Sequence, residues 1–408
     1  MSEEEVVEEP PPLPKAVLAR PMVLVDNQSD FRLALDDLLS ASGPLALDAE
    51  RASGFRYSSR AYLVQAHRRG SANYLIDPLG VPDLSDITTE LGDLEWILHA
   101  AHQDLPSLRE IGVEPQILFD TELGARLAGL PRVGLQGVVE DILGLSLAKE
   151  HSAADWSTRP LPEQWLTYAA LDVELLPAVR DEIHRILEIS GKLDLAREEF
   201  AAQLTLSPTG PRAEPWRRLS GLHQIRGPKA LAVARELWQA REEYAREIDT
   251  SPGRLVPDRS LVAALLANPK SKGELAGLKA FHGRASRSQL DRWWEAMERG
   301  KTTEDLPEAR AHSEGPPPPR VWVDKNPEAH ARFQAAKEAL ALVSEEHNIP
   351  SENLLTPDYL RRVCWEPPAD VTEESIAHAL ESRGARAWQI SLVAKPLTEA
   401  FVGNHQKD

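Results

Sequence analysis

The sequence predicts a mixed α/β domain followed by two small all-α domains. Over residues 21–205, apolar runs of strand length alternate with helical patterns, which is typical of a single α/β domain. The strand pattern stops after Pro-Thr-Gly-Pro at 208–211, and residues 206–300 contain helical patterns separated by glycine and proline. A third, helical segment covers residues 320–408. The total of 408 residues also exceeds what one ordinary core accommodates.

The first domain supplies all the predicted strands, which are Leu45–Glu50, Ala61–Gln65, Asn73–Ile76 and Trp96–Ala100. Its predicted helices are Phe31–Ser40, Leu105–Ile111, Leu135–Leu143 and Pro162–Leu175, with another near Asp181–Leu187. Because the two kinds of element are interleaved along the chain, we expect helices to pack on a sheet within one domain.

Two segments have compositions that cannot form a core. Residues 1–20 contain a glutamate run followed by PPPLP, which predicts a disordered tail. Residues 301–319 are polar and end in four prolines, which is typical of a semi-rigid linker.

The two helical segments resemble each other. RLVPD at 254–258 matches LLTPD at 354–358, an offset of 100 residues. We interpret this as a diverged duplication. The alternative is that both are ordinary starts of a helix, with proline near the first helical position and aspartate in the first turn.

The chain is acidic, with a formal net charge of −18 from 46 basic and 64 acidic residues. The whole-chain charge argues against nucleic acid, because phosphate binding needs a positive surface. However, residues 211–300 contain 17 Lys and Arg against 11 Asp and Glu. An acidic protein with a basic middle domain can therefore still bind a nucleic acid.

Cysteine content and hydropathy indicate the compartment. The single cysteine, Cys364, cannot form an intrachain disulfide, which fits a reducing environment. The longest apolar run that we find, Leu261–Ala267, is far below the ~18 residues needed to cross a membrane. The first residues, MSEEEVVEEP, carry acids where a secretory signal has basic residues. We expect a soluble, monomeric, cytoplasmic protein without a membrane partner.

Asp48 and Glu50 form a carboxylate pair in the predicted strand Leu45–Glu50. Residues two apart on a strand point to the same face, so Leu47 and Ala49 point to the other. Two adjacent carboxylates repel each other unless a cation lies between them, and oxygen ligands suit Mg²⁺ or Mn²⁺.

Two further patterns contain carboxylates. Asp104 follows the predicted strand Trp96–Ala100, at the start of a helix, where an acid is also ordinary. Tyr168 and Asp172 are four residues apart and share one face of the predicted helix Pro162–Leu175. Taken singly, each of these patterns has a structural explanation.

Taken in order, the set resembles the DEDD exonucleases of the tyrosine subclass. Further similarity to ribonuclease D lies in Lys149-Glu150, Asp155-Trp156-Ser157, Arg159-Pro160-Leu161 and Gln164. The second domain resembles the helicase-and-ribonuclease-D C-terminal (HRDC) domain through Leu222-His-Gln-Ile-Arg226-Gly227, Ala230-Leu231, Leu237 and Pro257-Asp258. The resemblance covers roughly residues 40–295, and the third segment is similar to a second, diverged HRDC domain.

The resemblance implies a ribonuclease H-like first domain with a two-metal site. It implies that Asp48 bridges two divalent ions, Mg²⁺ or Mn²⁺. Glu50 and Asp172 would complete the coordination of the first ion, and Asp104 would hold the second ion. Tyr168 would orient the attacking water.

Six basic residues are candidate contacts to nucleic acid. Arg159 is expected either to contact the substrate backbone or to pair with an interior acid such as Asp155. The other five lie in the basic second domain, where they form either a phosphate-binding face or simply a solvated surface. They are Arg217, Arg218, Arg226, Lys229 and Arg235.

We therefore expect a 3′–5′ exoribonuclease that trims RNA 3′ ends, such as those of tRNA precursors, and releases nucleoside 5′-monophosphates. Single-stranded DNA is the alternative substrate, because the same metal site suits either sugar. A second alternative is a non-catalytic nucleic-acid-binding protein with an inactive site.

Overall fold

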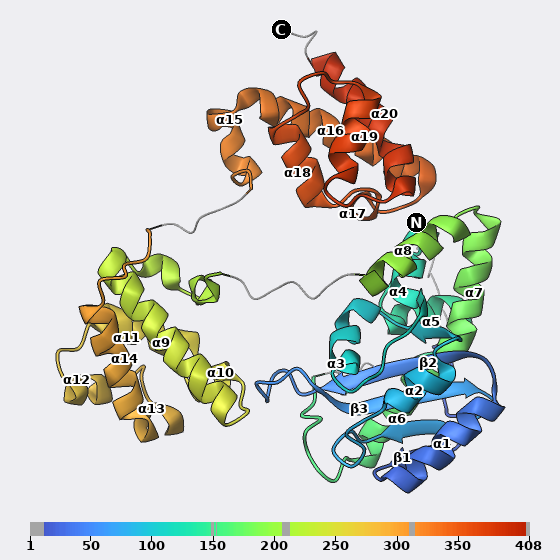
Figure 1. Ribbon diagram of the computed structural model, residues 1–408, viewed down its shortest axis with the longest axis horizontal. Helices are drawn as coiled ribbons and strands as arrows, with labels where there is room; N and C mark the ends of the chain where they lie inside the picture. The colour runs from blue at the N-terminus through green and yellow to red at the C-terminus, as the bar shows by residue number, and fades with distance from the viewer. Residues whose placement is uncertain (1–11, 148–150, 152, 206–212, 310–314, 405–408) are drawn as a thin grey trace, which may run out of the picture.

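The structure is a computed structural model that describes residues 12–147, 151, 153–205, 213–309 and 315–404. The described helices and strands form an α/β unit and two all-α units (Figure 1), which confirms the predicted fold class. Within these residues, no helix is both long enough and apolar enough to span a membrane. Lys149 and Glu150 of the sequence pattern lie outside the described residues.

The α/β unit is built on one mixed sheet with the strand order β1-β4-β3-β2-β5-β6. Its strands are β1 (Met22–Val25), β2 (Ser42–Arg51), β3 (Ala61–Arg69), β4 (Asn73–Ile76), β5 (Glu95–Leu98) and β6 (Ile117–Asp120). β2 is antiparallel to β3 and parallel to β5, so it lies inside the sheet. Its central place fixes the backbone of Asp48 and Glu50.

Helices cover both faces of this sheet. The helices of the unit are α1 (Gln28–Ser40), α2 (Ser85–Leu91), α3 (Leu105–Arg109), α4 (Thr121–Ala128), α5 (Leu135–Leu143), α6 (Glu163–Glu174), α7 (Leu176–Ile189) and α8 (Leu193–Thr205), with a 3₁₀ turn at Ala101–Gln103. Leu45, Leu47 and Ala49 of β2 pack with α1, α2 and α3. The other face of the sheet packs against α6, which contacts β2, β3 and β4.

The sequence did not predict β1, β6, α2, α4 and α8. β1 and β6 have only four residues each, but so does β4, which was predicted, so length alone does not explain why they were missed. The strand predicted over Trp96–Ala100 ends at Leu98, because Ala100 adopts a left-handed conformation (φ 59°) that turns the chain.

Part of the predicted disordered tail is ordered. Lys15 pairs with Ser146, and Leu18 packs in the core beneath α6. Glu174, at the end of α6, accepts hydrogen bonds from the backbone N–H groups of Ala19 (2.7 Å) and Arg20 (3.1 Å). The prediction for 1–20 is therefore wrong over residues 12–20, where backbone bonds to Ser146, apolar contacts of Ala16 and Leu18, and the Glu174 carboxylate hold the segment. Residues 1–11 lie outside the described residues.

The second unit is a helical bundle with its own core. Its helices are α9 (Pro228–Glu247), α10 (Pro252–Leu255), α11 (Asp258–Ala267), α12 (Lys272–Gly277), α13 (Arg284–Ser288) and α14 (Leu290–Thr302), preceded by short 3₁₀ turns at Pro215–Arg218 and Leu222–Gln224. α9 and α14 pack so closely that a Cβ at Gly300 would collide with the backbone of Val233. Trp293 is fully buried between these helices.

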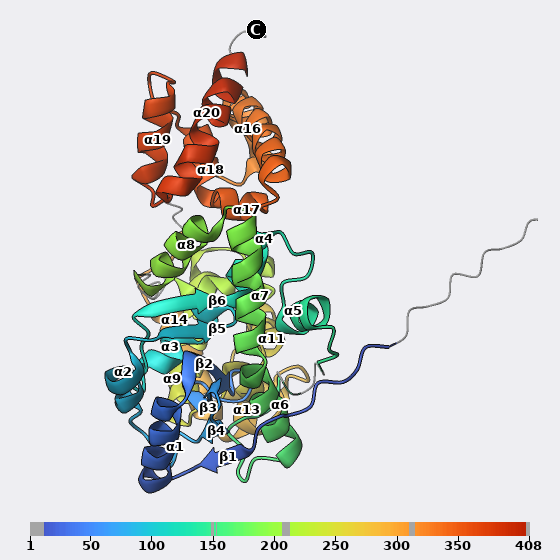
Figure 2. The same cartoon turned by 90° about the vertical axis from the view of Figure 1, so that its right-hand side faces the viewer.

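The third unit packs on the first (Figure 2). Its helices are α15 (Trp322–Lys325), α16 (Pro327–His347), α17 (Ser351–Leu354), α18 (Pro357–Trp365), α19 (Glu373–Glu381) and α20 (Ala387–Asn404), after a 3₁₀ turn at Pro319–Val321. One apolar core includes residues of this unit and of α4, α5, α7 and α8. Lys192 donates to the carbonyls of Leu127 (2.9 Å) and Asn348 (3.1 Å), and Glu199 accepts from the Trp388 indole (2.9 Å).

The two all-α units share one order of helices. In the second unit, long α9 is followed by short α10 and then α11, while α16, α17 and α18 follow the same order in the third. The matching segments 254–258 and 354–358 occupy the junctions α10–α11 and α17–α18. The likeness in sequence therefore extends to the arrangement of helices, as a duplication predicts.

The second unit reaches the first through Asp249, which follows α9. Figure 1 shows the β2–β3 loop, residues 52–60, extending toward α10. The Asp249 carboxylate accepts from the backbone N–H of Tyr57 (3.2 Å) and Ser58 (2.9 Å) and from the hydroxyl of Tyr62 (3.2 Å). Asp249 has a positive φ of 44°, a region that aspartate tolerates better than most residues.

A second group of contacts holds the start of the same loop. The Arg254 side chain donates to the carbonyl of Gly54 (2.7 Å), and its guanidinium lies 3.8 Å from the ring centroid of Phe55. The N–H of Ser251 donates to the carbonyl of Phe55 (2.9 Å). The loop that follows Asp48 and Glu50 is therefore held by the second unit over most of its length.

Removing the Asp249 carboxylate should loosen this loop. In Asp249→Gly the backbone keeps its positive φ but the acceptor is lost, so amide hydrogen exchange at Tyr57 and Ser58 should accelerate about tenfold. Asp249→Asn keeps both an acceptor oxygen and the tolerance of this φ, and it should exchange like the wild type. Equal exchange in the glycine variant and the wild type would show that Asp249 does not hold the loop.

Candidate metal centre

Strand β2 places two carboxylates on the face of the sheet that α6 covers. Asp48 and Glu50 alternate with Leu47 and Ala49, whose side chains enter the opposite core. Glu50 is buried, while Asp48 is partly exposed. The strand thus holds two acids in a fixed relation, as the two-residue spacing predicts.

Helix α6 brings a third carboxylate to the same place. Asp172 is buried, and one ligand oxygen each of Asp48, Glu50 and Asp172 lie within 4.8 Å of one another. Asp172 Oδ1 is buried without a hydrogen-bond partner among the described residues. Tyr168, one helical turn earlier, interacts with Asp172 through its hydroxyl and is close enough to feel the charges of Asp48 and Glu50.

Asp104 is placed beside this group rather than within it. It lies at the start of α3, after the turn that follows β5, and its side chain is buried. Its Oδ1 lies 3.3 Å from a guanidinium nitrogen of Arg51, the residue after Glu50. Asp104 and Asp48 nevertheless repel each other, as do Asp104 and Glu50. The structure therefore brings together all five residues predicted from the motifs, with Asp104 as the outer member.

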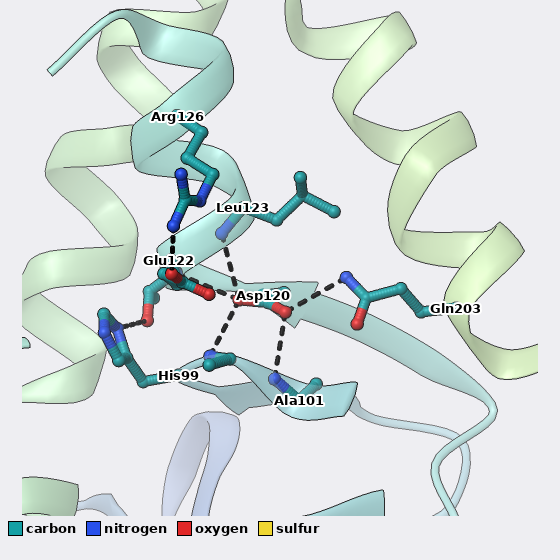
Figure 3. A network of polar contacts seen from close by, with 9 residues as sticks. His99, Ala101, Asp120, Glu122, Leu123, Arg126 and Gln203 are labelled. Atoms are coloured by element: carbon teal, nitrogen blue, oxygen red, sulfur yellow. Dashed lines mark hydrogen bonds and ion pairs between the residues drawn. The ribbon is translucent and has the colours of Figure 1, made fainter. Parts of the chain in front are cut away.

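A buried acid that the motifs did not single out holds the turn that carries Asp104. Figure 3 shows Asp120, at the end of β6, accepting from the N–H of Ala101 (2.9 Å), that of Leu123 (3.1 Å) and the amide of Gln203 (3.0 Å). It also accepts from the N–H groups of Ala100 and Glu122. Asp120 thereby caps α4 and fixes the turn at 100–104 in one set of bonds. Its only signal in the sequence is that of an ordinary helix cap.

The electrostatics of the cluster are unfavourable without a cation. Burial raises the pKa of Glu50 and of Asp172, and the neighbouring carboxylates raise both further. Burial likewise raises the pKa of Asp48 and of Asp104, while Arg51 opposes the shift at both. Burial and the adjacent acids also raise the pKa of the Tyr168 hydroxyl, which keeps its proton at neutral pH.

These features fit a divalent metal centre. The donors are all carboxylate oxygens, which hard cations such as Mg²⁺ and Mn²⁺ prefer. The unpartnered Oδ1 of Asp172 is a buried acceptor that a cation would satisfy, since buried polar atoms are rarely left without a partner. A positive ion among the acids would also relieve their repulsion.

Arg159 makes interior contacts. Its guanidinium forms a two-pronged pair with Asp77 (Nε–Oδ2 2.6 Å), where the sequence had suggested Asp155 as the interior partner. It also donates to the carbonyls of Tyr62 and Trp156. These bonds tie the segment before α6 to β3 and to the end of β4, which explains why an arginine occurs there.

The other five candidate contacts lie on the second unit. Arg218 and Arg226 are exposed. The other three contact the segment after α14. Lys229 donates to the carbonyl of Thr303 (2.8 Å), Arg235 pairs with Asp305 (2.9 Å), and Arg217 donates to the carbonyl of Glu308 (3.0 Å). Part of the predicted linker 301–319 is therefore laid along the basic face.

Known proteins are similar to this chain over most of its length. Three family models match this chain: a 3′–5′ exonuclease over residues 22–188, an HRDC domain over 230–297, and a 3′ to 5′ exonuclease C-terminal domain over 315–401. Ribonuclease D of Escherichia coli (strain K12) is 30% identical over 336 residues, which are 80% of this chain and 85% of that protein. The chain belongs to the ribonuclease D family.

Solved structures agree with this membership. A protein from Bifidobacterium adolescentis is 38% identical, with a TM-score of 0.87 over 96% of this chain and all of that one. The Escherichia coli RNase D structure is 26% identical, with a TM-score of 0.68 over 94% of this chain and 99% of that one. This ribonuclease D-like protein is accordingly a 3′–5′ exoribonuclease, a hydrolase that binds RNA and depends on divalent metal.

The family models also refine the account of the third unit. Its all-α fold agrees with the sequence prediction, but the model that matches it is the exonuclease C-terminal domain rather than the HRDC domain. The two units match separate family models, so the duplication suggested by 254–258 and 354–358 stays a prediction.

Neutralising one acid of the cluster should stabilise the metal-free protein. In Asp48→Asn the repulsion within the cluster is reduced, so the Tm without divalent ions should rise by about 2–5 °C, while Mn²⁺ should stabilise this variant less than the wild type. Thermal unfolding with EDTA or Mn²⁺ measures both effects. Asp194→Asn, which removes an exposed carboxylate on α8, is the control. It should change neither the Tm in EDTA nor the Tm with Mn²⁺. A lower Tm for Asp48→Asn in EDTA would contradict a repulsive cluster.

Proposed function

We propose that Asp48, Glu50, Asp104, Tyr168 and Asp172 form the site at which this ribonuclease D-like protein hydrolyses RNA from the 3′ end and releases nucleoside 5′-monophosphates. The observation that carries this proposal is the meeting of three carboxylates within 4.8 Å, one of them with an unpartnered buried oxygen. The order and spacing of the five residues along the chain also support it.

Two divalent ions, Mg²⁺ or Mn²⁺, are the proposed cofactors. Asp48, Glu50 and Asp172 would hold one ion, and Asp48 and Asp104 would hold the other. When bound, such ions lower the pKa of the attacking water and offset the charge that develops on the phosphate and the leaving 3′ oxygen.

The protein's own groups position the reactants. The Tyr168 hydroxyl keeps its proton, so it can donate a hydrogen bond to the oxygen of the attacking water and orient its lone pair toward phosphorus. Without that water, the hydroxyl donates its single proton to Asp172 on the next turn of α6, and the attacking water would take over this hydrogen bond. The rigid helix therefore fixes the water-orienting phenol and a metal ligand together.

The proposed RNA path extends over the second unit. Arg218 and Arg226 are exposed and suited to phosphate contacts. Arg217, Lys229 and Arg235 would contribute by exchanging their contacts with residues 303–308 for phosphate oxygens. Arg159 would act indirectly, through the segment that it holds before α6.

Structured RNA, such as tRNA precursors, is the proposed substrate. The Escherichia coli RNase D structure is described as that of an exoribonuclease involved in structured RNA processing, which supports the same class here. DNA 3′ ends remain the alternative substrate. We further propose a cytoplasmic monomer, which cell fractionation and light scattering would test.

The first experiment follows matched RNA and DNA strands labelled at either end. We expect stepwise shortening from the 3′ end of RNA with Mg²⁺ or Mn²⁺, no reaction in EDTA, and a loss on the order of a thousandfold in Asp48→Ala. Tyr168→Phe should lose about ten- to a hundredfold in kcat while still binding Mn²⁺. Binding of both strands without cleavage would instead support the non-catalytic alternative. Faster cleavage of DNA than of RNA would support the alternative of a DNA exonuclease.

The basic face can be tested through the salt dependence of RNA binding. Replacing both Arg218 and Arg226 by alanine should lower the slope of log Kd against log salt concentration by about 2, because two phosphate contacts are lost. Lys325→Ala, an exposed cation on the third unit, is the control. Binding is measured with Ca²⁺ in place of Mg²⁺ to prevent turnover. Equal slopes in all three proteins would exclude this face from the RNA path.

A further inference from the structure

Arg51 is a cation built into the acidic cluster. One guanidinium nitrogen donates to the carbonyl of Gln103 (2.6 Å), and another lies 3.3 Å from Asp104 Oδ1. Its charge also acts on Asp48 and Glu50. Within the part of the chain that the structure describes, it is a positive group in direct contact with a proposed metal ligand, among four acidic side chains that repel one another.

The backbone is irregular where Arg51 lies. Strict alternation along β2 would place Arg51 on the opposite face from Glu50, with Leu47 and Ala49. Arg51 is the last residue of β2, and Glu50 pairs with Leu63 while Arg51 pairs with Ala61, so one residue of β3 between them is left as the extra residue of a bulge. Bulges are common next to active sites. Here Arg51 reaches Asp104 and remains beside Glu50.

Arg51 also faces a pocket. It lines a cavity of about 280 Å³ together with Glu50 and Gly54 and with residues of the segment before α6. Its side chain keeps 27% of its surface exposed, whereas the Asp104 side chain keeps 8%. The guanidinium thus lies between a buried carboxylate and an open space next to the cluster.

We propose that Arg51 is a positioning residue that makes binding of the second metal ion at Asp104 depend on RNA binding. Without RNA, the guanidinium holds Asp104 and weakens cation binding there, while Asp48, Glu50 and Asp172 bind the first ion tightly. With RNA, a phosphate in the pocket offers the guanidinium a two-pronged partner and frees Asp104 for the second ion. This inference rests on the proposed function of the five-residue site.

The test counts Mn²⁺ ions bound to the full chain without RNA, by calorimetry and by electron paramagnetic resonance. The wild type should bind one ion tightly and a second at least about tenfold more weakly. In Arg51→Met the second ion should bind about tenfold more tightly, and Arg51→Lys, which keeps the charge, should resemble the wild type. Arg180→Met removes a similarly exposed arginine that pairs with Glu95, and it is the control.

RNA hydrolysis supplies a second readout. In Arg51→Met the Mn²⁺ concentration for half-maximal activity should fall, whereas KM for RNA should rise about tenfold because the phosphate partner is lost. A merely structural role would not lower the metal requirement. The Tm of each variant in EDTA verifies folding.

The outcomes separate the two proposals. Two ions bound with equal affinity in the wild type, or an unchanged second affinity in Arg51→Met, would overturn the role of Arg51 and leave the site itself supported. If the wild type binds no Mn²⁺, the proposed metal centre fails as well.

Discussion

Mutual repulsion among buried carboxylates is the constraint on which the rest of this structure depends. Asp48 and Glu50 come from a central strand, Asp104 from a turn at the end of β5, and Asp172 from a helix across the sheet. Charged carboxylates that lie so close together and are largely shielded from water are unfavourable without a counterion. The fold must therefore hold three separate segments against their own repulsion, which explains why their backbones are anchored on several sides.

Asp120, Asp77 and Asp249, the acids that support the surrounding fold, have hydrogen-bond partners that the acids of the cluster lack. Asp120 is as buried as Asp172, yet its two oxygens accept five hydrogen bonds, whereas Oδ1 of Asp172 has no partner among the described residues. Asp77 forms a two-pronged pair with Arg159, and Asp249 holds the β2–β3 loop. These three supporting acids each accept hydrogen bonds at both oxygens, whereas the cluster contains a buried carboxylate oxygen, Oδ1 of Asp172, that has no partner among the described residues.

The sequence predicted the arrangement of the candidate cluster better than it predicted its support. The two-residue spacing of Asp48 and Glu50 and the four-residue spacing of Tyr168 and Asp172 place each pair on one face of its strand or helix. That these pairs meet each other was implied by the resemblance to the DEDD exonucleases and not by local periodicity. The pairs Arg51–Asp104 and Arg159–Asp77 join residues 53 and 82 positions apart. They depend on how the sheet is ordered, which no local pattern encodes. Asp120 was missed for the same reason, since a cap and a turn-holding carboxylate look alike in sequence.

The net charge of the chain is a poor guide to its partner because the charges are arranged locally. Residues 303–308 bring acids and backbone carbonyls to Arg217, Lys229 and Arg235, so the basic face is partly neutralised by the chain itself. Such exposed contacts contribute only about 0–1 kcal/mol each, and a phosphate can replace them at little cost. At Arg51 we propose the same exchange with a buried partner, Asp104, which is itself a proposed metal ligand. A kind of contact that contributes little to stability on the surface would therefore determine, at Arg51, whether Asp104 can bind the second ion.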